Sequence, residues 1–286
     1  MKFTVYQSSH VGGRKYNQDM VAHAYTEHAL LLVLADGMGG HQHGEVAAQI
    51  AIHTYTQAFI KHAQPRVPEP QTFLRAVMQQ AHDTIIRFAS EQKLGGNPGS
   101  TCVAALVQDG QVHWAHAGDS RLYLLRDGNI AAVTHDHSLV QQWADLGIIS
   151  PAEMKTHPER NKILNCLGGV KDMFFVESSP SVPLLDGDIL LLCSDGLWSP
   201  LQDEEVASGF TAVPLPLGLA ALIDTALLRD GPRADNTTAI ALHWGNAEPE
   251  QPAPQAVCVI LDPQRDNPES ELLGRTLPNI RKLDSD

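Results

Sequence analysis

Apolar residues follow two different periods along the first 245 residues, and these periods predict the order of the elements. Short apolar runs predict strands near the start of the chain, and apolar residues three or four positions apart then predict two helices. Pro65, Pro68 and Pro70 separate the two helices, because proline does not continue a helix interior. The expected elements are strands at 3–7, 20–26 and 30–35, and helices around 47–58 and 74–88.

An antiparallel meander is expected from Ser100 onward. Asp109-Gly110 and Asp127-Gly128 are each flanked by strand-like runs, and Asp-Gly is favoured in two-residue hairpin turns. The further elements expected are strands at 101–108, 111–117, 120–126, 129–134, 188–194 and 236–244, and helices at 138–146, with Ser138 as N-cap, and 216–228. Antiparallel strands interleaved with pairs of helices indicate an α+β fold, with two antiparallel sheets packed together and helices on both outer faces.

The composition changes after Trp244. Residues 246–286 contain six prolines, and Asp and Glu outnumber Lys and Arg by eight to four. We therefore expect one domain over 1–245 and an acidic, proline-rich tail over 246–286 that stays largely disordered, because it buries too little apolar surface. Within the tail, the apolar run 256–261 could add a strand to the domain or dock on a partner.

The charge balance argues against two classes of partner. Lys and Arg number 20 and Asp and Glu 33, so the net charge of −13 repels nucleic acid and anionic lipid. No apolar run approaches the ~20 residues of a membrane span, and the N-terminus lacks the apolar stretch of a signal peptide. Four scattered cysteines without CxxC spacing predict reduced thiols. We expect a cytoplasmic protein that binds neither nucleic acid nor membrane.

Five aspartates stand at the ends of apolar strands. Asp36 follows LLLVLA and Asp195 follows ILLLCS, and each is followed by glycine; Asp19 and Asp235 precede strands, and Asp119 lies in the turn GDSR. A rigid strand can hold a terminal carboxylate to the tolerance that a metal ion requires. Hard oxygen ligands of this kind suit Mg²⁺ or Mn²⁺ and not zinc.

Other candidate groups have simpler explanations. The Asp-Gly pairs that begin at Asp109, Asp127 and Asp230 are expected to be ordinary turns, because Asp-Gly is common there. The 14 histidines are dispersed along the chain, and we expect most of them to lie on the surface or in the core. The strand-end aspartates are therefore the main candidates for chemistry.

The ordered motifs resemble the metal-dependent protein serine/threonine phosphatases of type 2C, the PPM family, in their bacterial form. The resemblance covers roughly residues 3–244. The matching segments are RKYNQD at 14–19, ADGMGGHQHGEVAA from 35, GSTCVAAL from 99, AHAGDSRLYLLRDG from 115, THDHSLVQQW from 134, LLCSDGLW from 191 and DNTTAIAL from 235.

The resemblance implies a four-layer αββα sandwich with a two-metal centre of Mg²⁺ or Mn²⁺ in the cleft between the sheets. By the family pattern, Asp36 bridges both ions, and Asp195 and Asp235 bind the first. The backbone carbonyl of Gly37 and, directly or through water, Asp19 hold the second.

The resemblance also implies roles for two further residues. Asp119, together with Asp195, would serve a third and weaker metal site that is found in bacterial members. Ser199 stands where many members supply another aspartate of that site. Arg14 would bind the substrate phosphate, which suits the two-pronged geometry of a guanidinium.

The expected activity is hydrolysis of phosphoserine and phosphothreonine in proteins by attack of a metal-bridging hydroxide, without a covalent phospho-enzyme. The expected partners are phosphorylated proteins, as targets of a serine/threonine kinase, and we expect a monomer. The alternative is a catalytically inactive family member that binds phosphoproteins or acts as a scaffold. Inactive members usually lose metal-binding aspartates, and all of the core ones are present here, so the enzyme is favoured.

Overall fold

The computed structural model describes residues 1–38, 43–169, 174–245 and 256–261. The strands are β1 Phe3–His10, β2 Asp19–Tyr25, β3 Ala29–Asp36, β4 Cys102–Gln108, β5 Gln111–Ala117, β6 Arg121–Arg126, β7 Asn129–Val133, β8 Glu177–Ser178, β9 Val182–Pro183, β10 Ile189–Cys193, β11 Thr237–Trp244 and β12 Val257–Leu261. The α-helices are α1 Gly44–His62, α2 Pro70–Glu91, α3 Leu139–Asp145, α4 Pro151–Met154, α5 Asp195–Trp198, α6 Asp203–Ser208 and α7 Leu215–Asp230.

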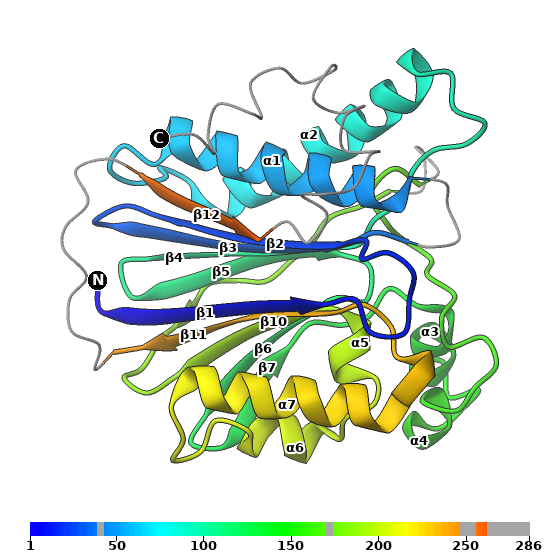
Figure 1. Cartoon of the computed structure of the whole chain (residues 1–286). Helices are drawn as coiled ribbons and strands as arrows, with labels where there is room; N and C mark the ends of the chain where they lie inside the picture. The colour runs from blue at the N-terminus through cyan, green and yellow to red at the C-terminus, as the bar shows by residue number, and fades with distance from the viewer. Residues whose placement is uncertain (39–42, 170–173, 246–255, 262–286) are drawn as a thin grey trace.

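Two antiparallel sheets pack face to face and helices cover both outer faces, as Figure 1 shows. One sheet has the strand order β1-β11-β10-β6-β7, and the other has the order β12-β2-β3-β4-β5-β8, with β9 also paired to β5. Helices α1 and α2 lie on the sheet that contains β2 and β3, while α6 and α7 lie on the opposite side of the sandwich. The expected α+β fold with an αββα arrangement is therefore confirmed.

Continuous apolar runs form the central strands because both faces of each strand are covered. In β3, Leu30, Leu32 and Leu34 point into the core between the sheets, and the alternate residues point into the core beneath α1 and α2. In β10, Leu190 and Leu192 face the same inter-sheet core, and the alternate residues face α7. These strands are fixed from both sides, so the residues at their ends have little freedom to move.

Most of the expected elements are confirmed, including both hairpins. Asp109 and Asp127 adopt φ values of 53° and 51°, and the glycine after each also has positive φ, as a type I′ turn requires. Ser138 caps α3 by accepting a hydrogen bond from the Gln141 N–H at 3.3 Å. The short elements β8, β9, α4, α5 and α6 were not predicted, because two to six residues are too few to display a period.

One short piece of the tail belongs to the sandwich. Strand β12 pairs antiparallel with β2, with Leu261 opposite Val21, and its Cys258 and Ile260 pack against the core beneath α1 and α2. Of the two alternatives for 256–261, the structure therefore shows the added strand. The expectation of disorder for the rest of the tail concerns 246–255 and 262–286, which lie outside the described residues.

All four thiols are free, as expected; Cys102 and Cys193 are buried, and Cys166 and Cys258 are partly buried. Within the described ranges, every helix is too short or too polar to serve as a membrane span.

Candidate metal centre

Five aspartates meet at one edge of the sandwich because of the direction of the strands. Strand β2 begins at Asp19 and its antiparallel neighbour β3 ends at Asp36, so the register places these two residues opposite each other. In the other sheet, the end of β10 lies beside the starts of β6 and β11. Asp195 follows β10 by two residues, and Asp119 and Asp235 each precede their strand by two residues.

The candidate residues surround one cavity of about 360 Å³. The cavity is lined by four of the aspartates, together with the glycine and the arginine expected at this site: Asp36, Asp119, Asp195, Asp235, Gly37 and Arg14. The structure therefore brings together candidates that lie more than 200 positions apart in the sequence.

Asp19 lies next to this cavity and is 1% exposed. Its Oδ2 accepts a hydrogen bond from Ser194 Oγ at 2.9 Å. Its Oδ1 is also buried, but it meets no hydrogen-bond donor among the described residues. A buried carboxylate oxygen without a donor is costly, and a bound cation is one way to satisfy it.

Gly37 occupies a position that no larger residue could take. A Cβ atom there would lie 2.4 Å from the carbonyl oxygen of Gly44 and 2.7 Å from that of Gln18. Its own N–H donates to the Gln18 carbonyl at 3.1 Å. The backbone of this turn is therefore pressed against its neighbours and held beside Asp36.

The aspartates raise one another's pKa values. Burial, followed by the negative charges of the neighbouring aspartates, raises the pKa of Asp36 and that of Asp195 well above the ordinary value. Burial also raises the pKa of Asp19 to about 6 and that of Asp119 to about 7, and for Asp119 the charge of Asp136 adds to the effect. The cluster therefore contains more carboxylates than the nearby positive charges balance.

These donors fit Mg²⁺ or Mn²⁺. All of the candidate side-chain ligands are carboxylates, whereas a structural zinc site usually contains histidine or cysteine. Cations would relieve the repulsion that raises the pKa values, and they would offer a partner to Asp19 Oδ1. Both observations are independent of the motif pattern.

Arg14 supplies a positive charge at the rim of the cavity. Its Nη2 donates to Asp235 Oδ2 at 2.5 Å, while 54% of its side chain stays exposed. This hydrogen bond raises the pKa of Arg14 still further, so the guanidinium is charged at any physiological pH. Arg14 is thus paired with one of the candidate ligands and remains accessible from solvent.

Three residues that sequence reasoning did not select also shape the site. Thr101 Oγ1 accepts from the Asp36 N–H at 3.3 Å and is hydrogen bonded to Ser120 Oγ at 2.6 Å, so it ties Asp36 to the turn of Asp119. Glu45 Oε2 accepts from Gln18 Nε2 at 2.9 Å, which places a further carboxylate behind Gln18. Ser194, which donates to Asp19, precedes Asp195 in the LLCSDGLW motif. No local sequence pattern marks Thr101, Glu45 or Ser194, because the partner of each lies far along the chain.

The raised pKa values predict how pH changes the stability of the metal-free protein. Asp19 and Asp119 bind protons more tightly when folded than in the unfolded chain, where their pKa is about 4. Their contribution to the free energy of unfolding is therefore largest at low pH, and it falls as the pH rises from about 4 to about 7. Cations need the deprotonated carboxylates, so their stabilising effect should grow over the same interval.

The measurement is thermal unfolding with EDTA or with saturating Mn²⁺. We expect Mn²⁺ to raise Tm by about 5 °C or more at pH ~7.5 and by much less at pH ~5. Asp36→Asn should lose most of this rise, whereas Asp127→Asn, in a hairpin turn, should keep it. An equal rise at both pH values would contradict the account.

Comparisons with known proteins agree with this geometry. A family model described as Protein phosphatase 2C matches residues 6–218. The serine/threonine phosphatase stp of Listeria monocytogenes is 38% identical over 178 residues, which cover 62% of this chain and 69% of that protein. The serine/threonine protein phosphatase PstP of Mycobacterium tuberculosis is 36% identical over 218 residues, which cover 74% of this chain but only 40% of that longer protein.

Solved structures extend the similarity to the fold. The crystal structure of the Mycobacterium tuberculosis phosphatase PstP/Ppp superimposes with a TM-score of 0.75 at 31% identity, covering 86% of this chain and 100% of that one. The catalytic domain of PstP in complex with two manganese ions gives a TM-score of 0.72 at 30% identity, covering 86% of this chain and 99% of that one. The chain belongs to the protein phosphatase 2C family of metal-dependent serine/threonine phosphatases.

Proposed function

We propose that this chain hydrolyses phosphoserine and phosphothreonine in proteins, using Mg²⁺ or Mn²⁺ bound by its aspartates. The observation that carries the proposal is the cluster of buried and partly buried, mutually repelling carboxylates around one cavity with Arg14 at its rim. Its chemistry suits a phosphate ester, because cations and a guanidinium both bind phosphoryl oxygens.

Each proposed ligand has a place in this arrangement. Asp36 would contact both ions, with Asp195 and Asp235 on the first, and with the Gly37 carbonyl and Asp19 on the second. Asp19 Oδ1 meets no hydrogen-bond donor among the described residues, which supports the role of Asp19 as a ligand. No side chain fits at Gly37, which supports the role of its backbone carbonyl. When bound, the ions supply a water of lowered pKa and positive charge towards the phosphoryl oxygens.

Asp119 and Asp195 would hold a third, weaker ion. Both line the cavity, and the pKa of each is raised. Ser199 lies one helical turn after Asp195, and its N–H donates to the Asp195 carbonyl at 2.9 Å. A hydroxyl at Ser199 adds no negative charge, so this ion would be held less tightly than the other two.

Arg14 would bind two phosphoryl oxygens and orient the substrate. Its exposed guanidinium, paired only with Asp235 among the described acidic groups, can exchange that partner for phosphate. The hydroxyls of Ser194 and Thr101 are occupied in positioning Asp19 and Asp36. This arrangement supports hydrolysis without a covalent phospho-enzyme.

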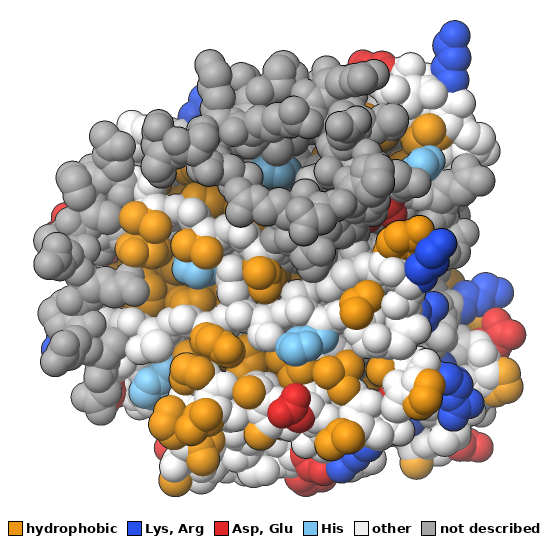
Figure 2. All heavy atoms as spheres, viewed as in Figure 1, with side chains coloured by type: hydrophobic (Ala, Val, Ile, Leu, Met, Phe, Trp, Pro, Cys, Tyr) orange, Lys and Arg blue, Asp and Glu red, His pale blue; other side chains and the backbone are white. Residues whose placement is uncertain are grey.

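Phosphorylated proteins that are targets of a serine/threonine kinase are the proposed substrates. On the face shown in Figure 2, Lys and Arg side chains lie at the right-hand margin, beside α3 and α4, with Asp and Glu side chains among them. The net charge of −13 disfavours nucleic acid as a partner. We further propose a cytoplasmic monomer in which residues 1–245 carry the activity, and in which the tail 246–286, apart from strand β12 of the sandwich, recruits a partner.

An inactive phosphoprotein-binding member of the family is the alternative. Loss of one or more metal-binding aspartates would favour it, but all five are present and four line one cavity. The structure therefore favours the enzyme.

Replacement of the proposed ligands tests the activity. We expect p-nitrophenyl phosphate and a phosphothreonine peptide to be hydrolysed only with Mn²⁺ or Mg²⁺, and not with EDTA. Asp36→Asn and Asp235→Asn should each lower kcat/KM by about 100-fold or more, because each removes a negative ligand. Asp127→Asn is the matched control, since it removes a carboxylate from a hairpin turn without touching the cavity. Absence of turnover in folded, Mn²⁺-loaded protein would favour the binding role.

Replacement of Arg14 separates substrate binding from metal binding. Arg14→Ala should lower kcat/KM by about 10- to 100-fold, and Arg14→Lys should restore only part of the loss, because an ammonium lacks the fork geometry. Calorimetric Mn²⁺ affinity should stay the same or increase, since Asp235 loses a competing partner. Arg66→Ala, which breaks a surface pair with Asp109, is the control. A weaker Mn²⁺ affinity in Arg14→Ala would show instead that Arg14 positions Asp235.

A further inference from the structure

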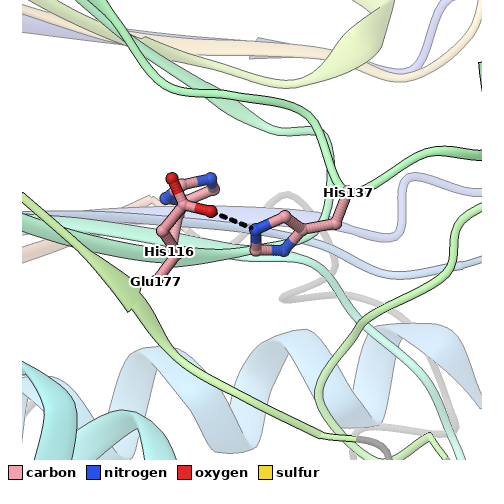
Figure 3. A group of neighbouring side chains, drawn as sticks. All are labelled: His116, His137 and Glu177. Atoms are coloured by element: carbon pink, nitrogen blue, oxygen red, sulfur yellow. Dashed lines mark hydrogen bonds and ion pairs between the residues drawn. The ribbon is translucent and has the colours of Figure 1, made fainter. Parts of the chain in front are cut away.

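Two histidines and a glutamate form the cluster that Figure 3 shows, and none of the three lines the aspartate cavity. His116 is on β5, Glu177 is opposite it on β8, and His137 comes from the segment between β7 and α3. His116 and His137 are buried, and their rings stack with centroids 4.6 Å apart. One ligand atom from each residue lies within 4.8 Å of the others, the spacing of a possible cation site.

The hydrogen bonds of His137 argue against a cation there. Its Nδ1 lies 3.1 Å from the backbone N–H of Gly118 and 2.8 Å from the side-chain amide nitrogen of Asn165, both of them donors. A ring nitrogen that accepts carries no proton, so the proton of neutral His137 is on Nε2. Nε2 lies 3.0 Å from Glu177 Oε2 and donates to it. A cation at Nε2 would have to displace this proton from a ring whose other nitrogen is already an acceptor.

Two hydrogen bonds connect His137 to the turn that carries Asp119. The Gly118 N–H donates to Nδ1 of the His137 ring, and the backbone N–H of His137 donates to the Gly118 carbonyl at 3.0 Å, so both backbone polar groups of the glycine are bonded to His137. Gly118 has a φ of 111°, and a Cβ atom there would lie 2.5 Å from Thr101 Cβ, so the turn needs glycine. The next residue is Asp119, whose own carbonyl accepts from Trp198 Nε1 at 2.9 Å.

His137 also joins this turn to the segment 139–165 beside the cavity. The Leu164 N–H donates to the His137 carbonyl at 2.8 Å, and Asn165 contacts the ring. Asn161 and Ile163, from the same segment, line the aspartate cavity. His137 therefore connects the Asp119 turn to one wall of the cavity, through its ring to Gly118 and Asn165 and through its backbone to Gly118 and Leu164.

We propose that His137, oriented by Glu177, is the positioning residue for Asp119 and so controls the affinity of the cation site that Asp119 helps to form. The inference rests on the proposed function, in which Asp119 is a cation ligand. Loss of the ring would leave the buried Gly118 N–H without an acceptor, and the turn would shift to find one. Groups behind a metal ligand typically change affinity by about 10- to 100-fold when they are removed.

Calorimetric titration with Mn²⁺ tests the proposal on the full chain. The Mn²⁺ binding that is lost in Asp119→Asn defines the Asp119-dependent site. We expect His137→Ala to weaken this site by about 10-fold or more and to leave the tighter sites unchanged. His137→Asn should restore most of the affinity, because its amide oxygen can accept from the Gly118 N–H. Glu177→Ala should weaken the site, and Glu177→Gln, which keeps an acceptor for Nε2–H, should do so less.

Controls separate positioning from general damage. His135→Ala removes an exposed neighbouring ring and should leave all sites unchanged. In the background of Asp119→Asn, His137→Ala should have no further effect on Mn²⁺ binding. If His137→Ala does not fold, the half-exposed Glu177 still provides the comparison through its Ala and Gln variants.

Three results would overturn the proposal: equal weakening of every site in His137→Ala, unchanged affinity in both His137→Ala and Glu177→Ala, or identical isotherms for the wild type and Asp119→Asn. None of these depends on turnover. A protein that binds Mn²⁺ as expected but hydrolyses no phosphate ester would defeat the proposed function and leave the positioning role intact.

Discussion

Mutual repulsion among carboxylates at one edge of the sandwich is the constraint on which the rest of the site depends. Burial and the negative charges of neighbouring aspartates raise the pKa values of Asp36 and Asp195. The pKa values of Asp19 and Asp119 are raised as well, with burial again the largest cause. Side chains with freedom to move would separate. They stay together because each is attached to a strand that is buried on both faces, such as β3 or β10.

Positive charge near the cluster is arranged so that it does not cancel the repulsion. Arg121 donates both Nε and Nη2 to Asp136, at 2.9 and 2.8 Å, and its guanidinium lies 3.6 Å from the ring centroid of Trp198. It therefore serves mainly its own partner, although it lowers the pKa of Asp119 in part. Arg14 reaches only Asp235, at the rim. The deficit of positive charge that remains is what divalent cations would supply.

The sequence was sufficient to predict the parts of this arrangement that have a local signal. Apolar runs predicted the central strands, Asp-Gly pairs predicted both hairpins, and the ordered motifs predicted the family and the sandwich. The contacts that position the proposed ligands carry no such signal. Ser194 reaches Asp19 across 175 positions and Glu177 reaches His137 across 40, so only the folded chain brings them together. The strand β12 was one of two alternatives, because an isolated apolar run does not specify its partner.

Anomalous diffraction from crystals soaked in Mn²⁺ would locate the cations without reference to activity. We expect two strong peaks beside the Asp36 carboxylate, one of them also near Asp195 and Asp235, with no peak between His116 and His137. A cavity without anomalous signal at saturating Mn²⁺, or a dominant peak at the histidines, would contradict this expectation.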